Sequence, residues 1–159
     1  MKITLVTVGK VKERFFADAI KEYEKRLSRY CRLKIVQVAD EKTPDTASEA
    51  QQRQIKEREG ERILAQLREG EYVIALAIEG RMASSKELSE KLEKLGIAGK
   101  SQVAFIIGGS LGLSEAVLKR ADEQLSFSRM TFPHQLMRVI LLEQVYRSYR
   151  ILSHEPYHK

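Results

Sequence analysis

Cysteine is nearly absent from this sequence, since Cys31 is the only one among 159 residues. A single thiol cannot form a disulfide within the chain, so the sequence predicts a protein of a reducing compartment. Long apolar runs are also missing, because none approaches the ~20 residues needed to cross a bilayer. The apolar stretch 3–8 is too short for the core of a signal peptide. We therefore expect a cytoplasmic protein that does not enter the membrane.

Several common site motifs are absent as well. The sequence has no GxxxxGK[ST] loop, which excludes an ordinary P-loop NTPase, and no GxSxG elbow, which removes support for a hydrolase of that type. Val8-Gly9-Lys10 follows the first apolar stretch, in place of the glycine fingerprint that binds dinucleotides. The three histidines and one cysteine lack metal-ligand spacing, so we expect no metal site.

The overall composition is that of a globular protein. Apolar residues make up 43% of the chain and charged residues 31%. The length of 159 residues predicts a single domain covering residues 1–159. The net charge of +6 at pH 7 favours encounters with polyanions, but many basic proteins of this size bind no nucleic acid.

Apolar runs and helical periodicity alternate along the chain, which predicts βαβ units. Short runs rich in branched residues indicate buried strands at 3–8, 33–38, 72–78 and 103–107. Between the first two strands, apolar residues recur every three or four positions and predict one face of a helix. These residues are Phe16, Ile20, Tyr23, Leu27 and Tyr30.

Local signals at the ends of these elements refine the prediction. Residues 46–49 (TASE) and 84–87 (SSKE) match capping boxes and predict two helix starts. Gly60 is expected to interrupt the first of these helices, which runs to about residue 67, and residues 79–81 are expected to turn the chain. The first half of that helix is predicted to be an exposed arm. The alternative is a surface near RNA that uses Arg53, Lys56 and Arg58.

The stretch 103–134 is the most distinctive part of the sequence. Its strand is followed at once by the glycine loop 108–113 (GGSLGL), and Ser114 offers an N-cap for a short helix. A second apolar segment, 124–128, is expected to form a neighbouring strand and leads into RMTFPH. Ligands of open α/β sheets bind beyond the carboxyl ends of the strands, so the two loops predict a binding site.

The residues of this stretch leave two interpretations open. Glycines after a strand often serve only to let a helix pack closely against it. Phe127 and Phe132 could wrap a purine-like group, but their spacing is equally suited to a role in the hydrophobic core.

The last predicted helix, from residue 133 to about 153, is apolar around most of its circumference. Only Glu143, Arg147 and Arg150 form a coherent polar stripe. A terminal helix of this kind needs burial on two sides, and in a short chain a second copy of the protein can provide the second side. We therefore expect a homodimer. The tail 154–159 (HEPYHK) adds two histidines and a tyrosine, which are groups that handle protons.

These segments together resemble one known family. IIGGSLGL, then LSFSRMTFPHQLMRVILLEQVYRSYRI and a terminal PYHK, are similar to the SPOUT class of methyltransferases and more narrowly to the ribosomal RNA large subunit methyltransferase H family. The resemblance covers the whole chain. It implies a SPOUT-type, open, mainly parallel α/β sheet with helices on both faces and a C-terminal trefoil knot. It also implies an obligate homodimer that transfers a methyl group from S-adenosyl-L-methionine to N3 of a pseudouridine in 23S ribosomal RNA, acting on the assembled ribosome.

The same resemblance implies the cofactor-binding residues. They lie at the end of the third strand, in the glycine loop and in the segment after the last strand: Leu76, Gly108, Phe127, Ser128, Arg129, Met130, Thr131 and Phe132. No metal is implied.

The family likeness and the composition of the tail together favour Arg147, Tyr157 and His158 as catalytic residues, with Arg138 a weaker fourth candidate. Tyr157 would stack on the target base, His158 would take a proton or contact phosphate, and a cation would stabilise the imide anion of the base. An ion pair of either arginine with Glu143 is the structural alternative. For His134, a hydrogen bond at the start of the helix is expected.

Two other functions fit parts of the sequence. A non-catalytic RNA-binding protein of ribosome assembly would account for the basic charge and the exposed helix. A small-molecule enzyme with a nucleotide-like cofactor, such as a flavin, would account for the glycine loop. Neither explains the two loops and the tail together.

Overall fold

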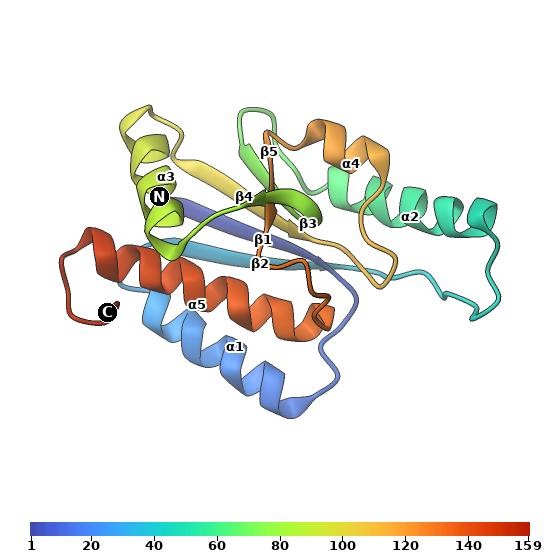
Figure 1. Cartoon of the computed structure of the whole chain (residues 1–159), viewed down its shortest axis with the longest axis horizontal. Helices are drawn as coiled ribbons and strands as arrows, with labels where there is room; N and C mark the ends of the chain where they lie inside the picture. Colours follow the sequence, from blue (N-terminus) through green and yellow to red (C-terminus); the bar gives the residue numbers. More distant parts are fainter.

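In the computed structural model, which describes residues 1–159, five strands form one sheet in the order β2-β1-β4-β3-β5 (Figure 1). All four strand pairs are parallel. The strands are β1 (Lys2–Val8), β2 (Arg32–Val38), β3 (Tyr72–Met82), β4 (Gln102–Ile107) and β5 (Glu123–Ser126). The prediction of an α/β fold with a parallel sheet is confirmed.

Helices cover both faces of the sheet (Figure 1). One face packs against α1 (Arg14–Leu27), α3 (Ser85–Ile97) and α5 (His134–Leu152), and the other against α2 (Glu49–Leu64) and α4 (Glu115–Arg120). The central strand β4 shows why: Phe105 is buried on the α5 side, while Ala104 and Ile106 are buried on the α2 side. A strand that is apolar on both sides requires two helical layers. None of the helices combines the length and apolar character that crossing a membrane would require.

The sheet order separates the two strands whose loops were expected to form the site. β3 lies between β4 and β5, so the expectation that segments 103–107 and 124–128 are neighbouring strands is wrong. Strands that follow one another along the chain are adjacent in the sheet in only about two-thirds of cases. The trefoil knot implied by the family resemblance stays a prediction, and this crossing order is compatible with it.

Strand β3 is longer than expected. It runs to Met82 and so includes residues 79–81, which we expected to turn the chain. Its register with β5 shifts between Leu76 and Arg81, and pairing then resumes. A Cβ on Gly80 would lie 2.7 Å from the backbone of Gln124. This glycine therefore permits a close approach to β5 in a stretch where the chain bends, since Leu76 and Arg81 both pair with Leu125.

Capping boxes begin both α2 and α3. The predicted one at Ser84 is confirmed, because its hydroxyl accepts from the N–H of Glu87 and its own N–H donates to the Glu87 carboxylate. The other is formed by Ser48 with Gln51, two residues later than the box predicted from Thr46. An N-cap of this kind stabilises a helix by about 1 kcal/mol.

Helix α2 is continuous, contrary to the expected break at Gly60. Gly60 is buried and faces Ser114, the N-cap of α4, so the missing side chain lets the two helices approach each other. Residues 49–54 are largely exposed, as predicted for the first half of the helix. Arg58 forms an ion pair with Glu41 and so is engaged within the chain.

Candidate functional site

A cavity of about 750 Å³ opens beyond the carboxyl ends of β4 and β5 and beside the middle of β3. Its walls come from residues 76–78 of β3, from the glycine loop 108–113, and from residues 127–128 and 130–133 of the β5–α5 loop. The volume lies within the roughly 300–1,000 Å³ that is usual for small-molecule sites. We call this space the strand-end cavity, and it lies where the parallel-sheet rule predicts a ligand.

The residues predicted to bind a cofactor converge on the strand-end cavity with one exception. Those that line it are Leu76, Gly108, Phe127, Ser128, Met130, Thr131 and Phe132. Arg129 does not line the cavity and is exposed. His134 and Met137, from the beginning of α5, were not predicted and complete the wall.

The glycine loop is closed on itself. Gly112 adopts a φ of +88°, and its N–H donates to the carbonyl oxygen of Gly109 at 3.1 Å. A Cβ on Gly108 would lie 3.0 Å from the backbone of Gly112 and 2.9 Å from the Leu113 side chain. A side chain at position 108 would therefore push the loop open, so these glycines shape the cavity wall itself.

The β5–α5 loop contains backbone N–H groups that have no acceptor in the protein. Of its amide groups only the N–H of Met130 donates within the chain, to the hydroxyl of Ser128 at 2.9 Å. The N–H groups of Phe127, Thr131 and Phe132 have no acceptor in the protein. No Lys, Arg, Asp or Glu lines the cavity. The site is therefore suited to a ligand with apolar or aromatic parts and hydrogen-bond acceptors, and no lining cation would repel positive charge on it.

His134 brings an ionisable group to the cavity wall. Its Nδ1 is buried without a hydrogen-bond partner, so the expected hydrogen bond at the helix start is not formed there. Burial lowers the pKa of His134, Arg138 and Lys12 lower it further, and Asp40 opposes this. The imidazole is consequently neutral at physiological pH, with one nitrogen able to donate and the other to accept.

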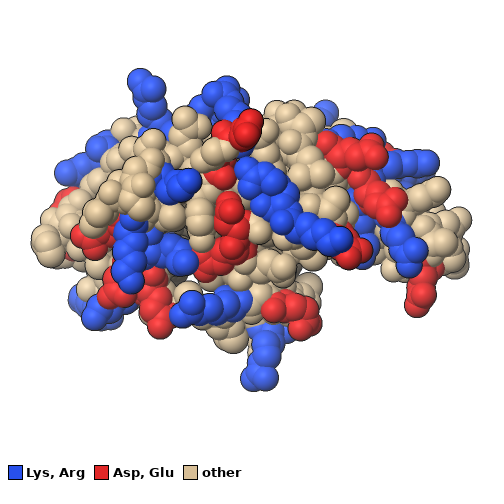
Figure 2. All heavy atoms as spheres, turned by 90° about the horizontal axis from the view of Figure 1, so that it is seen from above, with Lys and Arg blue, Asp and Glu red and all other residues tan.

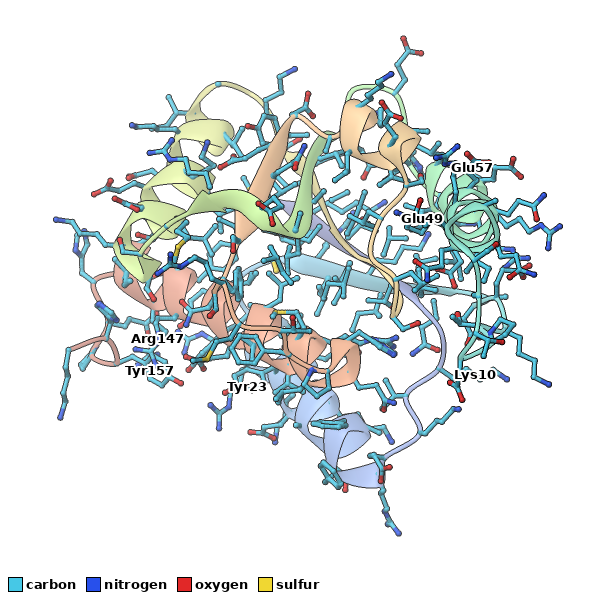
Figure 3. The ribbon with its side chains drawn as sticks, turned by 45° about the vertical axis from the view of Figure 1, so that its right-hand side comes forward. Lys10, Tyr23, Glu49, Glu57, Arg147 and Tyr157 are labelled. Carbon is cyan, nitrogen blue, oxygen red and sulfur yellow. The ribbon has the colours of Figure 1, made fainter.

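The three predicted catalytic residues also meet one another, but in a separate group. Arg147 Nε donates to Glu143 Oε1 at 2.8 Å, and its guanidinium carbon lies 4.6 Å from the ring centroid of Tyr157. Arg147 Nη1 is 3.1 Å from His158 Nδ1, and the Tyr157 hydroxyl donates to Glu143 Oε2 at 2.8 Å. We call Glu143, Arg147, Tyr157 and His158 the tail cluster. Figure 3 shows Arg147 and Tyr157 side by side next to α5.

The tail cluster does not reach the cavity of its own chain. No residue beyond Met137 lines the cavity. Arg147 lies ten positions after Met137 on the same helix, which corresponds to about 15 Å at 1.5 Å per residue, and Glu143 lies six positions after it, about 9 Å. The cavity therefore lies at the beginning of α5, and the predicted catalytic residues lie toward its C-terminal end.

Arg138, the weaker catalytic candidate, is only 1% exposed. One of its terminal nitrogens donates to the carbonyl oxygens of Val8 and Gly9, at 2.9 and 3.0 Å, and so holds the end of β1. It forms no ion pair with Glu143, whereas Arg147 does so within the same chain. Its other two guanidinium nitrogens, Nε and Nη1, are buried without a hydrogen-bond partner in the chain.

Sequence reasoning missed the central role of Glu143, which it treated only as a partner for an arginine. The signal was present in the spacing, since Glu143 and Arg147 are four residues apart on the polar stripe of α5. What no spacing could indicate is that the tail folds back onto the same carboxylate.

Charges of both signs are interspersed on the face shown in Figure 2. The net charge of +6 therefore does not form a continuous basic platform on this face. A surface of this kind gives little support to recognition of RNA through phosphate attraction alone.

Comparisons with known proteins show the family to which the chain is related. The family described as "Predicted SPOUT methyltransferase" matches residues 1–158. The chain is 64% identical over 159 residues to a protein of Bifidobacterium adolescentis named ribosomal RNA large subunit methyltransferase H, and each chain is covered completely. It is 62% identical, again over the whole of both chains, to the protein of the same name from Clostridium novyi.

A solved structure gives a more distant likeness. A probable methylase family protein from Haemophilus influenzae Rd KW20 superposes with a TM-score of 0.54 at 13% sequence identity, over 96% of this chain and 66% of that one. At this identity the likeness concerns the fold alone.

Proposed function

Because the chain belongs to the SPOUT methyltransferase family, we propose that it transfers a methyl group from S-adenosyl-L-methionine to N3 of a pseudouridine in 23S ribosomal RNA, on the assembled ribosome in the cytoplasm. The relatives' names supply the substrate class. The observation that carries the proposal is the strand-end cavity, with its closed glycine loop and its unpaired backbone donors.

The residues present fit S-adenosylmethionine. The aromatic side chains Phe127 and Phe132 would face its adenine, and the free N–H groups of the β5–α5 loop would donate to its ring nitrogens and carboxylate. The sulfonium would meet no positively charged side chain. Gly108 would let the backbone approach closely, since a Cβ there would already crowd the loop.

When bound, S-adenosylmethionine supplies a methyl group on positively charged sulfur, and its transfer to N3 leaves a neutral thioether and releases the N3 proton to solvent. The chain's residues must hold the base in line and stabilise its imide anion. Arg147 is the cation we assign to this anion, and Tyr157 stacks on the base.

His158 has a more specific assignment from its geometry. Arg147 can only donate, so His158 Nδ1 accepts and the ring carries its proton on Nε2. In this arrangement His158 presents a donor to a base carbonyl or a phosphate oxygen. Taking up a proton at Nδ1 would first require the bond to Arg147 to break.

We infer that the reaction needs a homodimer, because Arg147 lies about 15 Å along α5 from Met137, the last residue that lines the cavity, and the tail residues Tyr157 and His158 are held beside Arg147. A two-fold related copy can bring the tail of one protomer to the cavity of the other. Large apolar side chains remain exposed near the cavity, among them Ile78, Met82 and Met130. Such side chains, together with the half-buried outer residues of α5, provide a surface for this contact.

The decisive experiment is methyl transfer from labelled S-adenosylmethionine to ribosomes that lack the modification, followed by mass analysis of the nucleosides. We expect label in one pseudouridine of 23S RNA and a poor rate on free 23S RNA, since a small protein without a separate RNA-binding module must read the shape of the ribosome. Calorimetry with the donor is the companion measurement. Ribosome binding without donor binding would indicate a non-catalytic assembly protein instead.

A further inference from the structure

One carboxylate in the tail cluster is shared by two tyrosines. Glu143 Oε2 accepts from the hydroxyl of Tyr157 at 2.8 Å and from the hydroxyl of Tyr23 at 2.8 Å, while Oε1 accepts from Arg147 at 2.8 Å. Tyr23 lies on α1, more than a hundred residues away in sequence. It belongs neither to the cavity nor to the residues that the sequence assigned to the site.

The packing around these hydrogen bonds leaves the aromatic rings little freedom. Tyr146 meets Tyr157 edge-on, with ring centroids 5.1 Å apart, and meets Tyr23 at 6.2 Å. Arg26 lies 5.2 Å from the ring of Tyr23 and 5.6 Å from that of Tyr146. Figure 3 shows Tyr23, Arg147 and Tyr157 at the same end of the α1–α5 pair, with Lys10 on the opposite side of the view.

We propose that Tyr23 is a positioning residue for the methyl-transfer reaction, which orients Tyr157 and Arg147 through the carboxylate of Glu143 that all three share. This inference rests on the proposed function of the tail. Tyr23 touches neither the donor nor the base. It acts by fixing the carboxylate on which the two catalytic side chains are held.

The physical reason is the arrangement of donors on one small anion. Arg147 and Tyr157 supply one donor to each oxygen of the Glu143 carboxylate, which can still turn about its terminal bond. Tyr23 adds a second donor on Oε2 from another helix, α1, and so fixes the plane of the carboxylate. Burial, followed by the hydrogen bond to Glu143, raises the pKa of Tyr23, so this hydroxyl remains a donor throughout the physiological range. Without it, Tyr157 and Arg147 share a carboxylate that α5 alone holds.

The test is Tyr23→Phe, which removes one hydroxyl and keeps the ring. The matched control is Tyr72→Phe, because Tyr72 also donates to a glutamate, Glu123, that pairs with a cation, Lys91, but does so at another edge of the sheet. We expect Tyr23→Phe to lower kcat roughly tenfold, which corresponds to the loss of one hydrogen bond to a charged group. The affinity for S-adenosylmethionine and the KM for ribosomes should stay within about twofold, and Tyr72→Phe should leave kcat unchanged.

A double-mutant cycle with Tyr157→Phe separates positioning from a general loss of structure. If Tyr23 acts through Glu143 on Tyr157, Tyr23→Phe should cost much less in the Tyr157→Phe background than in the wild-type protein. Equal factors in the two backgrounds would overturn the inference, as would a wild-type kcat for Tyr23→Phe alone.

The outcomes also distinguish this inference from the proposed function. If Tyr157→Phe and Tyr157→Ala both turn over normally, the assignment of the tail to catalysis fails. If they are slow while Tyr23→Phe is normal, only the positioning role fails. Hydrogen exchange of the C-terminal peptide, residues 153–159, gives a measurement independent of turnover. It should become faster in Tyr23→Phe and stay unchanged in Tyr72→Phe, and unchanged exchange in both would contradict the inference.

Discussion

Glu59 places a carboxyl group directly behind the glycine loop, with only 4% of its surface exposed. Its Oε2 accepts from the N–H of Glu41 at 3.0 Å, and its Oε1 lies 3.0 Å from the position that a Cβ on Gly109 would occupy. Burial raises the pKa of this carboxyl, and the neighbouring acids Asp40 and Glu41 raise it further, against the hydrogen bond from the Glu41 backbone. The loop that forms the cavity wall is thus supported by a group that is costly to ionise in place.

Glu59→Gln should therefore stabilise the protein at neutral pH. Because folding raises the pKa of Glu59, protonation of this carboxyl favours the folded state. Its contribution to the free energy of unfolding is complete at pH values below the pKa in the unfolded chain, and it is lost as the pH rises through the pKa in the folded protein. At pH 7.5 the ionised carboxylate opposes folding, whereas glutamine keeps the acceptor for Glu41 without the charge. We expect a higher Tm for the variant at pH 7.5, by roughly 2–4 °C per kcal/mol gained, and no difference near pH 4.

The control for this prediction is Glu61→Gln, an exposed position on the same helix. It should leave the Tm unchanged at both pH values. A lower Tm for Glu59→Gln at pH 7.5 would mean that the charge of Glu59 is used in folding and not merely tolerated.

At the level of single residues, the sequence predicted the cavity wall better than it predicted the tail. The spacing of Phe127 and Phe132 left a role in the core open, and it was the family resemblance that assigned them to the site; both line the cavity. Arg129 was predicted to bind the cofactor because it lies within the segment 127–132. Successive residues of an irregular loop point in different directions, however, and Arg129 does not line the cavity. The hydrogen bond between Tyr23 and Glu143 could not be predicted, because it joins two helices that are distant in sequence.

Among the elements, α2 and α4 show how tertiary contact overrides helix propensity. By propensity alone, replacing Gly60 with alanine inside α2 should stabilise the helix by about 1 kcal/mol. A Cβ there, however, would lie 2.3 Å from Ser114 Oγ, 3.1 Å from Ser114 Cβ and 3.3 Å from Val117. Ser114 is itself the N-cap of α4, so it cannot turn away without freeing the N–H of Val117.

Gly60→Ala should consequently destabilise the protein, by about 1–3 kcal/mol as for other overpacked sites. Urea unfolding followed by circular dichroism gives the free energy. Gly96→Ala in α3 is the matched control, because its Cβ would meet only the Met1 side chain at an ordinary 3.5 Å. That variant should be neutral or gain up to about 1 kcal/mol. A gain of stability for Gly60→Ala would show that α2 and α4 separate easily.

The kinds of element were more predictable than their ends. The apolar run 103–107 could only be a strand with a helical layer on each side, and two capping boxes placed helix starts to within two residues. The predicted break at Gly60 was wrong, and the turn predicted at 79–81 is a bend within β3 that does not end the strand. At Gly60 and at Gly80 a side chain would collide with the backbone or a side chain of another element. A glycine in the sequence gives the same signal for a turn as for two elements that pack closely.

For the whole molecule, the order of the strands is the feature that the sequence alone could not supply. Each strand was recognisable, but nothing local states that β3 inserts between β4 and β5. That insertion brings the middle of β3 and the ends of β4 and β5 to one cavity, while α5 leads away from it toward Arg147 and the tail. The proposed dimer follows from this geometry, because it is the simplest way to bring the two parts together.

The dimer hypothesis predicts complementation between two inactive variants. Gly108→Ala should disrupt the glycine loop and abolish donor binding, and Tyr157→Ala should remove the stacking side chain while leaving donor binding intact, as calorimetry can verify. If each site combines the cavity of one protomer with the tail of the other, a heterodimer of the two variants contains one complete site.

Unfolding and refolding an equal mixture should then restore about a quarter of wild-type methyl transfer, since random pairing gives half heterodimers with one good site in two. Each variant refolded alone is the control and should remain inactive. A mixture as inactive as its components, with heterodimers present by native mass spectrometry, would mean that each chain completes its own site, and the tail would then have to leave Glu143 to reach the cavity.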